Sequence, residues 1–194
     1  MSQLELVVGP NGAGKSTFVE FVLLPILGDI PFVNADVIAK ERWPEAPESH
    51  SYEAARTASE LRNRLISIGR SFVAETVFSH PSKLDLVRSA VSHGYDVNMH
   101  VVMVPSDLSV QRVRRRSDAG GHDVPEDKIR ERHERLWPLV VQAVARSTTA
   151  AFYDNTDAAG PLIVAKFAHG VVVTPPRWPS WAPTVLTEAW PVDN

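Results

Sequence analysis

The chain has 194 residues and a formal net charge of −3, and its 44% apolar and 22% charged residues are the balance of one globular domain. The negative charge argues against a dedicated nucleic-acid binder, and the absence of cysteine excludes disulfides, thiolate zinc sites and cysteine nucleophiles. Because no apolar run can span a bilayer and the first residues lack a secretory signal, we expect a soluble cytoplasmic protein.

Strand-like and helix-like segments alternate along the chain. In chain order, we expect a strand at 4–8, a helix at 15–27, a strand at 32–35, a helix at 51–68, a strand at 72–74, a helix at 81–94, a strand at 97–104, and helices at 108–116 and 126–146. The helix at 51–68 should bury a face made of Ala54, Ala58, Leu61, Leu65 and Ile68. Residues 151–153 and 162–167 are two strands or a strand and a helix, and Pro138 should kink its helix or mark a boundary. The alternation predicts an α/β three-layer sandwich with a central, mostly parallel sheet.

A glycine-rich segment, GPNGAGKST, carries the strongest signal in the chain. It matches G-x-x-x-x-G-K-[ST] without a gap and lies between a predicted strand and a predicted helix, which is the setting of a P-loop NTPase. Glycines permit backbone angles closed to residues with a Cβ, so successive N–H groups can point at phosphate, and the helix adds its positive end. Lys15 can reach the β- and γ-phosphates of ATP, and the Ser16 hydroxyl can bind Mg²⁺.

The segment Asp154-Asn155-Thr156 follows a predicted strand and can line an adenine pocket, although a plain Asx turn explains it nearly as well. With it, the residues predicted to hold ATP are Gly9, Asn11, Gly12, Ala13, Gly14, Lys15, Ser16, Thr17 and Asn155.

Two acids follow predicted strands, and in a parallel sheet such positions meet at one edge. Asp36 can accept the proton of an attacking hydroxyl, or it can cap the following helix as Asn34 can. Glu75 can bind an acceptor hydroxyl or a water on Mg²⁺, or cap the next loop, and Thr76 beside it can hydrogen-bond the acceptor.

A cluster of arginines follows at residues 112–116 and again at Arg130, Arg132 and Arg135. A helical hairpin over about 112–135, bending at Gly120 and Gly121, would form a lid that brings guanidinium groups onto the transferred phosphate. The interspersed acids also fit a solvated surface, so we expect at least one arginine to contact phosphate and most others to be surface residues. His122 in the glycine break is expected to stabilise the loop rather than to bind a ligand.

The assembled motifs resemble the zeta-toxin family of P-loop kinases over roughly residues 4–170. The resemblance rests on GPNGAGKST, VNADVIA, FVAETVFS, RVRRRSDAGGHDVPEDKIRERHERL and FYDNT, of which the GGHDVP segment flanked by arginines is the most specific. We therefore expect a kinase-like domain at 1–173, and a Pro- and Trp-rich tail at 174–194 that packs on it or binds a partner.

The resemblance also implies a function, since toxin members of the family use ATP to phosphorylate the sugar 3′-hydroxyl of UDP-N-acetylglucosamine, and a small antitoxin blocks their nucleotide site. It implies Lys15 as the phosphate lysine, Asp36 as the base, Glu75 as the acceptor-binding acid, and Arg116 and Arg132 as the lid arginines. The chain is shorter than full-length toxins, and we expect the larger acceptor-binding insertions of those toxins to be absent.

Two other functions stay open. One is a nucleoside, polynucleotide-end or antibiotic kinase of the same fold, although the broken charge pattern disfavours nucleic acid. The other is an ATP-binding toxin or regulator whose main property is binding a partner, which the tail favours.

Overall fold

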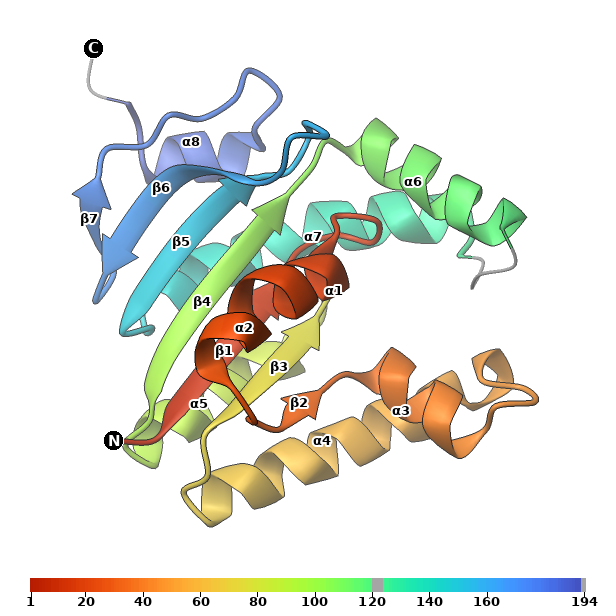
Figure 1. Cartoon of the computed structure of the whole chain (residues 1–194). Helices are drawn as coiled ribbons and strands as arrows, with labels where there is room; N and C mark the ends of the chain where they lie inside the picture. The colour runs from red at the N-terminus through yellow and green to blue at the C-terminus, as the bar shows by residue number, and fades with distance from the viewer. Residues whose placement is uncertain (120–123, 193–194) are drawn as a thin grey trace.

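The computed structural model describes residues 1–119 and 124–192. Within these residues, seven strands form one sheet in the order β2-β3-β1-β4-β5-β6-β7 (Figure 1). The first five strands are parallel to their neighbours, and β6 and β7 are antiparallel additions at one edge. The strands are β1 Gln3–Val8, β2 Phe32–Val33, β3 Phe72–Thr76, β4 Asp96–Met103, β5 Thr149–Asp154, β6 Leu162–Ala168 and β7 Val171–Thr174.

The helices cover both faces of this sheet, with α1 in front of β1 in Figure 1 and α5 and α7 behind it. They are α1 Lys15–Phe18, α2 Leu24–Leu27, α3 Ala35–Arg42, α4 Ser51–Ser67, α5 Ser82–Ser92, α6 Ser106–Asp118, α7 Glu126–Val144 and α8 Thr184–Ala189. The predicted three-layer α/β sandwich with a mostly parallel sheet is therefore confirmed. Among the described residues, no helix has the length and apolar character needed to cross a membrane.

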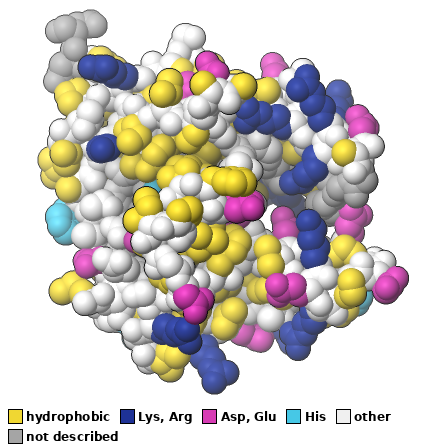
Figure 2. Space-filling model, viewed as in Figure 1, with side chains coloured by type: hydrophobic (Ala, Val, Ile, Leu, Met, Phe, Trp, Pro, Cys, Tyr) yellow, Lys and Arg dark blue, Asp and Glu magenta, His cyan; other side chains and the backbone are white. Residues whose placement is uncertain are grey.

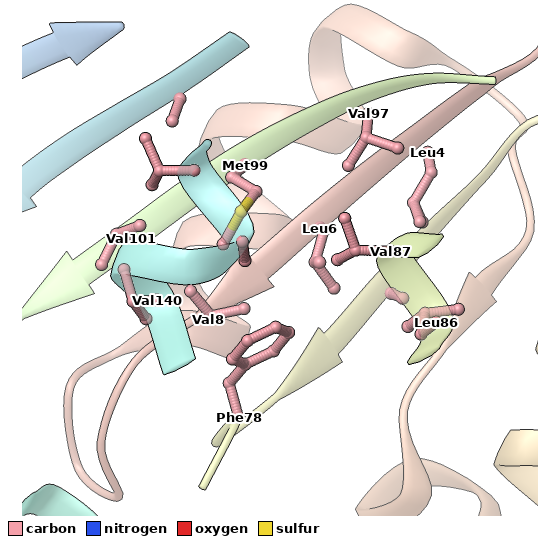
Figure 3. Packing of buried hydrophobic residues seen from close by; sticks show 14 of the residues in the cluster. Leu4, Leu6, Val8, Phe78, Leu86, Val87, Val97, Met99, Val101 and Val140 are labelled. Carbon is pink, nitrogen blue, oxygen red and sulfur yellow. The ribbon is translucent and has the colours of Figure 1, made fainter. Parts of the chain in front are cut away.

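The alternation of side chains along β1 divides the core into two layers. Leu4, Leu6 and Val8 face the side covered by α5 and α7, whereas Val7 faces the side covered by α1. Figure 3 shows the first layer, in which Leu6 and Val8 lie near Phe78 and the helix residues Val87 and Val140. With both faces covered, β1 and β4 are fully buried over most of their length, as their nearly continuous apolar sequence predicts.

The helix expected at 15–27 contains a π-helical turn, Val19–Leu23, between α1 and α2. Leu24 donates its N–H to the carbonyl of Val19, five residues back, and Pro25 has no N–H to donate. The proline therefore interrupts the regular bonding pattern without ending the helix.

Four other expectations need correction or refinement. The expected strand at 32–35 is shorter because the side chain of Asn34 caps α3. Helix α7 continues through Pro138, so the predicted boundary there is wrong, and β5 and β6 are both strands. In α4, Leu61 and Ile68 are 38% and 62% exposed rather than inward, and Arg62 lies in the buried face. The expected bend at Gly120 and Gly121, and His122, lie outside the described residues.

The Pro- and Trp-rich tail packs on the body of the protein. Trp190 contacts Phe152 of β5 and Phe167 of β6, with ring centroids 5.7 Å and 4.5 Å apart, and the Trp178 indole N–H donates to the carbonyl of Trp190 at 3.0 Å. The segment is not wholly extended, because it contains α8, whose Leu186 is fully buried. The tail covers the antiparallel end of the sheet.

This packing predicts that Trp190→Ala destabilises the fold. The change removes aromatic contacts to two strands, so we expect the free energy of unfolding to fall by about 2–3 kcal/mol in urea denaturation. Trp43→Ala is the matched control, since that ring stacks on His50 outside the aromatic cluster of the tail. An unchanged free energy of unfolding in Trp190→Ala would show that this ring of the tail adds nothing to the core.

Candidate active site

A cleft of about 710 Å³ opens where the parallel strands β1, β2 and β3 end. Its volume is within the range of ligand sites that hold a whole small molecule. One wall is the loop after β1, a second is formed by β3 with α3, α4 and α5, and a third by α6 and α7. Figure 2 shows Lys and Arg side chains over α6, beside a hollow that separates them from α3. The lining includes Asn11, Gly12, Gly14, Lys15, Ser16, Thr17, Asp36, Arg62, Glu75, Thr76, Ser79, Lys83, Arg112, Arg116 and Arg132.

The loop between β1 and α1 is held so closely that two of its glycines cannot be replaced without movement. A Cβ on Gly9 would lie 2.2 Å from the carbonyl oxygen of Val102 in β4. Gly14 has a φ of 87°, and its Cβ would lie 2.6 Å from the amide nitrogen of Asn155. That same amide donates to the carbonyl of Ala13 at 2.7 Å.

Three of the residues predicted to hold ATP do not line the cleft. Gly9 lies against β4, Ala13 belongs to an apolar cluster of the core, and Asn155 holds the loop through its bond to Ala13. The Asx turn considered for this segment is present, since the Asp154 carboxylate accepts the N–H of Thr156 at 3.0 Å.

Lys15 begins α1 and is buried, and its ammonium group donates to the carbonyl of Pro10 at 2.9 Å. Burial lowers the pKa of Lys15, whereas the nearby carboxylates of Glu75 and Asp36 favour its charged form and Arg116 opposes it. The two predicted acids and one predicted arginine therefore lie close to the predicted phosphate lysine.

A chain of hydrogen bonds through Glu75 joins two walls of the cleft, the phosphate loop and the wall formed by β3 and α3. The Ser16 hydroxyl donates to the two carboxylate oxygens of Glu75 at 3.1 and 2.9 Å, and the Asn34 amide donates to one of them at 2.6 Å. The other end of the Asn34 side chain accepts the N–H groups of Asp36 at 2.7 Å and Val37 at 3.3 Å. Asn34 is thus the N-cap of α3 and also a positioning residue for Glu75.

The structure shows which of the two candidate residues, Asn34 or Asp36, caps α3. Because Asn34 caps α3, the Asp36 carboxylate is in the first helical turn and lines the cleft. The link from Asn34 to Glu75 was not predicted, and its only sequence signal is a good capping residue placed at the end of a strand, two positions before an acid.

Helix α6 braces the phosphate loop from the third wall. The Ser109 hydroxyl donates to the carbonyl of Asn11, and the Arg112 guanidinium donates to the carbonyls of Gly12 at 3.5 Å and Thr156 at 3.4 Å. Neither residue was among the predicted site residues.

The arginines divide into two groups. Arg112, Arg116 and Arg132 line the cleft. Three of the others that the sequence singled out pair with acids: Arg114 with Glu126, Arg130 with Asp107 at 2.8 Å and Glu126 at 2.9 Å, and Arg135 with Glu131 at 3.2 Å. Most of the arginines outside the cleft lining are exposed, and the expected contact of at least one arginine with phosphate stays a prediction.

The chain turns sharply after β3, at the far side of Glu75 from the phosphate loop. Phe78 is fully buried and has a φ of 65°, a left-handed conformation that is unusual for a large side chain. Its N–H donates to the Thr76 hydroxyl at 3.3 Å. The buried ring anchors the turn in the core, so Thr76 and Ser79 on either side of it line the cleft.

Comparisons with known proteins agree with this architecture. A family model described as an AAA domain (AAA_33) matches residues 4–139. A chain of the AvrRxo1-ORF1:-ORF2 complex with ATP has a TM-score of 0.70 and 16% identity over 99% of this chain and 64% of that one. A chain of the PezAT toxin-antitoxin system of Streptococcus pneumoniae has a TM-score of 0.66 and 15% identity over 97% of this chain and 78% of that one.

A shikimate kinase from Acinetobacter baumannii, in complex with shikimate, has a TM-score of 0.52 and 22% identity over 74% of this chain and 80% of its own. This chain spans less than two thirds of the AvrRxo1 chain, and no curated protein matches it in sequence. At these identities the structures show the fold alone, which is a P-loop kinase fold, and the predicted likeness to zeta-toxin-like kinases is confirmed at that level. Because the family model spans more than half of its residues, the chain belongs to the AAA_33 family of AAA domains.

Proposed function

We propose that this chain is an ATP-dependent phosphotransferase that moves the γ-phosphoryl group of ATP to a hydroxyl group of a small molecule. The observation that carries the proposal is the shared cleft of a phosphate-loop lysine, Lys15, and a carboxylate, Asp36, close enough to favour the charged form of that lysine. A carboxylate at this position can accept the proton of a hydroxyl group that attacks the γ-phosphorus.

The side chains present fit ATP and Mg²⁺. Lys15 is a buried cation, and the Ser16 hydroxyl lies against the Glu75 carboxylate. The side-chain amide oxygen of Asn11 is buried without a hydrogen-bond partner among the described residues. We propose that Lys15 and the loop amides hold the phosphates and that Ser16, supported by Glu75, holds the metal. When bound, Mg²⁺ would neutralise charge on the β- and γ-phosphates.

In the proposed reaction, the oxygen of the acceptor hydroxyl forms a bond to the γ-phosphorus, and Asp36 accepts the proton of that hydroxyl. The bond between that phosphorus and the β–γ bridging oxygen breaks, and ADP leaves with the electron pair. Lys15, Arg116 and Arg132 donate hydrogen bonds to the phosphoryl oxygens, where negative charge is concentrated. Glu75 and Thr76 orient the acceptor.

The acceptor and the partner are finer proposals that rest on the zeta-toxin resemblance. UDP-N-acetylglucosamine is the first acceptor to test, within a panel of nucleotide sugars, nucleosides and aminoglycoside-like alcohols incubated with labelled ATP. A small antitoxin-like protein is the proposed partner, and co-purification of such a protein in a stable complex would support it.

Lys15→Ala and Asp36→Asn should separate binding from transfer. We expect both to abolish measurable transfer, with the loss in Asp36→Asn about 10²–10⁴-fold because a general base contributes that much. Tight ATP binding, measured by calorimetry, should survive only in Asp36→Asn. Undiminished turnover by Asp36→Asn would remove this mechanism.

The arginines of α6 and α7 give a second prediction. Arg116→Ala or Arg132→Ala should lower kcat by about 10²-fold or more, with a smaller change in ATP affinity, because each is proposed to contact the transferred group. Arg135→Ala is the matched control, since Arg135 pairs with Glu131 away from the cleft lining. Equal effects at all three positions would point to general helix stability instead.

Asn34 gives a third prediction, because its cap and its bond to Glu75 can be separated. In Asn34→Asp the side chain still caps α3, but it cannot donate to Glu75 and it adds a like charge beside it. We expect a change in melting temperature of only a few degrees and a fall in kcat of about tenfold or more, because residues that hydrogen-bond to the groups around a metal ion typically contribute that much. Full activity with an unchanged acceptor KM would contradict a role through Glu75.

A further inference from the structure

A buried arginine lies on the inward face of α4, which was expected to consist of apolar residues. Arg62 is only 5% exposed and shares this face with Ala58 and Leu65. Its guanidinium forms no hydrogen bond and no ion pair with any residue that the structure describes, and burial lowers its pKa. A buried charge without a partner is costly, and an arginine stays protonated, so the site calls for an anion.

A second cation faces the same space. Lys83, in the first turn of α5, is half-buried and also pairs with no described carboxylate. Burial lowers the pKa of Lys83, and the nearby Arg62 lowers it further. The acid that follows on this helix, Asp85, pairs with Arg88 at 3.0 Å. Neither Arg62 nor Lys83 therefore pairs with a described carboxylate, although the carboxylate of Asp85 lines the cavity beside them.

The position of the pair in the cleft indicates what kind of molecule would neutralise it. Arg62 and Lys83 line the main cleft together with Asp36 and Lys15, and they also line an adjoining cavity of about 290 Å³ between α4 and α5. The adjoining cavity includes Ser59, Asn63 and Ser89, whose side chains can donate hydrogen bonds. Lys15 belongs to the phosphate loop, whereas Arg62 and Lys83 lie on the helices of the opposite wall.

We infer that Arg62 and Lys83 form a second anion site, which binds a phosphate or diphosphate group of the acceptor. The inference rests on the proposed transfer to a hydroxyl and narrows its substrate class to phosphorylated alcohols. A bidentate guanidinium and an ammonium group together match the charge and the several oxygens of a phosphoryl group. Uncharged alcohols would leave both cations unpaired and bind poorly.

The first test measures binding and needs no turnover. The full chain is saturated with a non-hydrolysable ATP analogue, which fills the phosphate loop, and is then titrated with inorganic phosphate by calorimetry or NMR. We expect phosphate to bind, and Arg62→Gln or Lys83→Gln to weaken it by about tenfold or more, since hydrogen bonds to charged groups are worth that much. Arg64→Gln, at an exposed position of the same helix, is the matched control.

Affinity for the ATP analogue should be the same in all of these variants. The melting temperature of Arg62→Gln should be unchanged or higher, because the variant removes an unpaired buried charge. Absence of phosphate binding to the wild type, or equal weakening in Arg64→Gln, would overturn the anion site even if the chain proves to be a kinase.

The second test compares matched acceptors with and without the anionic group: a nucleoside and its monophosphate, a sugar and its phosphate, and a sugar acid. We expect kcat/KM to be at least about 100-fold higher for the phosphorylated member, and Arg62→Gln to remove most of that preference. Equal use of the uncharged member, or a preference for the sugar acid, would overturn the assignment. If no acceptor is phosphorylated while phosphate still binds as described, the proposed function fails and the anion site stands.

Discussion

The carboxylate of Glu75 is the contact on which the geometry of the cleft depends, because it joins three segments that the chain brings together from distant positions. Glu75 lies in β3, and it accepts hydrogen bonds from Ser16 at the start of α1 and from Asn34 ahead of α3. Asn34 also caps α3, so the turn that carries Asp36 is fixed by the same network. Half-buried hydrogen bonds to a charged acceptor are stronger than neutral ones, which suits a network that must set the distance between the phosphate loop and a carboxylate.

The loop itself is held from the other side by α6 and by the segment after β5. Ser109 and Arg112 of α6 bond to carbonyls of the loop, and Asn155 bonds to another. Arg116 lies one helical turn beyond Arg112 and lines the cleft, so the same helix that braces the loop carries a cation above it. Any displacement of α6 would therefore change the loop and the position of that cation together. The same helix therefore both supports the phosphate loop and sets the position of Arg116 in the cleft.

The sequence predicted what depends on local pattern and missed what depends on distant partners. Apolar runs and glycine breaks were enough for the parallel strands and most helices, and the phosphate-loop motif located the cleft. Arg62 was missed because its neighbours Asn63 and Arg64 are polar, so one buried charge among them resembles a surface position until the packing of α4 is known. Helix α8 was missed because Pro and Trp dominate its surroundings, and its stability depends on distant partners, namely the core around Leu186 and the aromatic cluster on β5 and β6.

The charged side chains of the cleft form separate cationic and carboxylate regions, and their arrangement indicates the charge of the substrates. One group of cations consists of Lys15 at the phosphate loop, Arg116 on α6 and Arg132 on α7. The carboxylates belong to Asp36 on α3 and Glu75 on β3. The second group of cations consists of Arg62 on α4 and Lys83 on α5. Carboxylates would repel a phosphate but can accept a hydroxyl proton, whereas each group of cations attracts an anion. A cleft with two cationic regions and two carboxylates fits a reaction between two anionic molecules that meet at a hydroxyl. For one anionic substrate and a neutral alcohol, the second group of cations would only add the cost of its own burial.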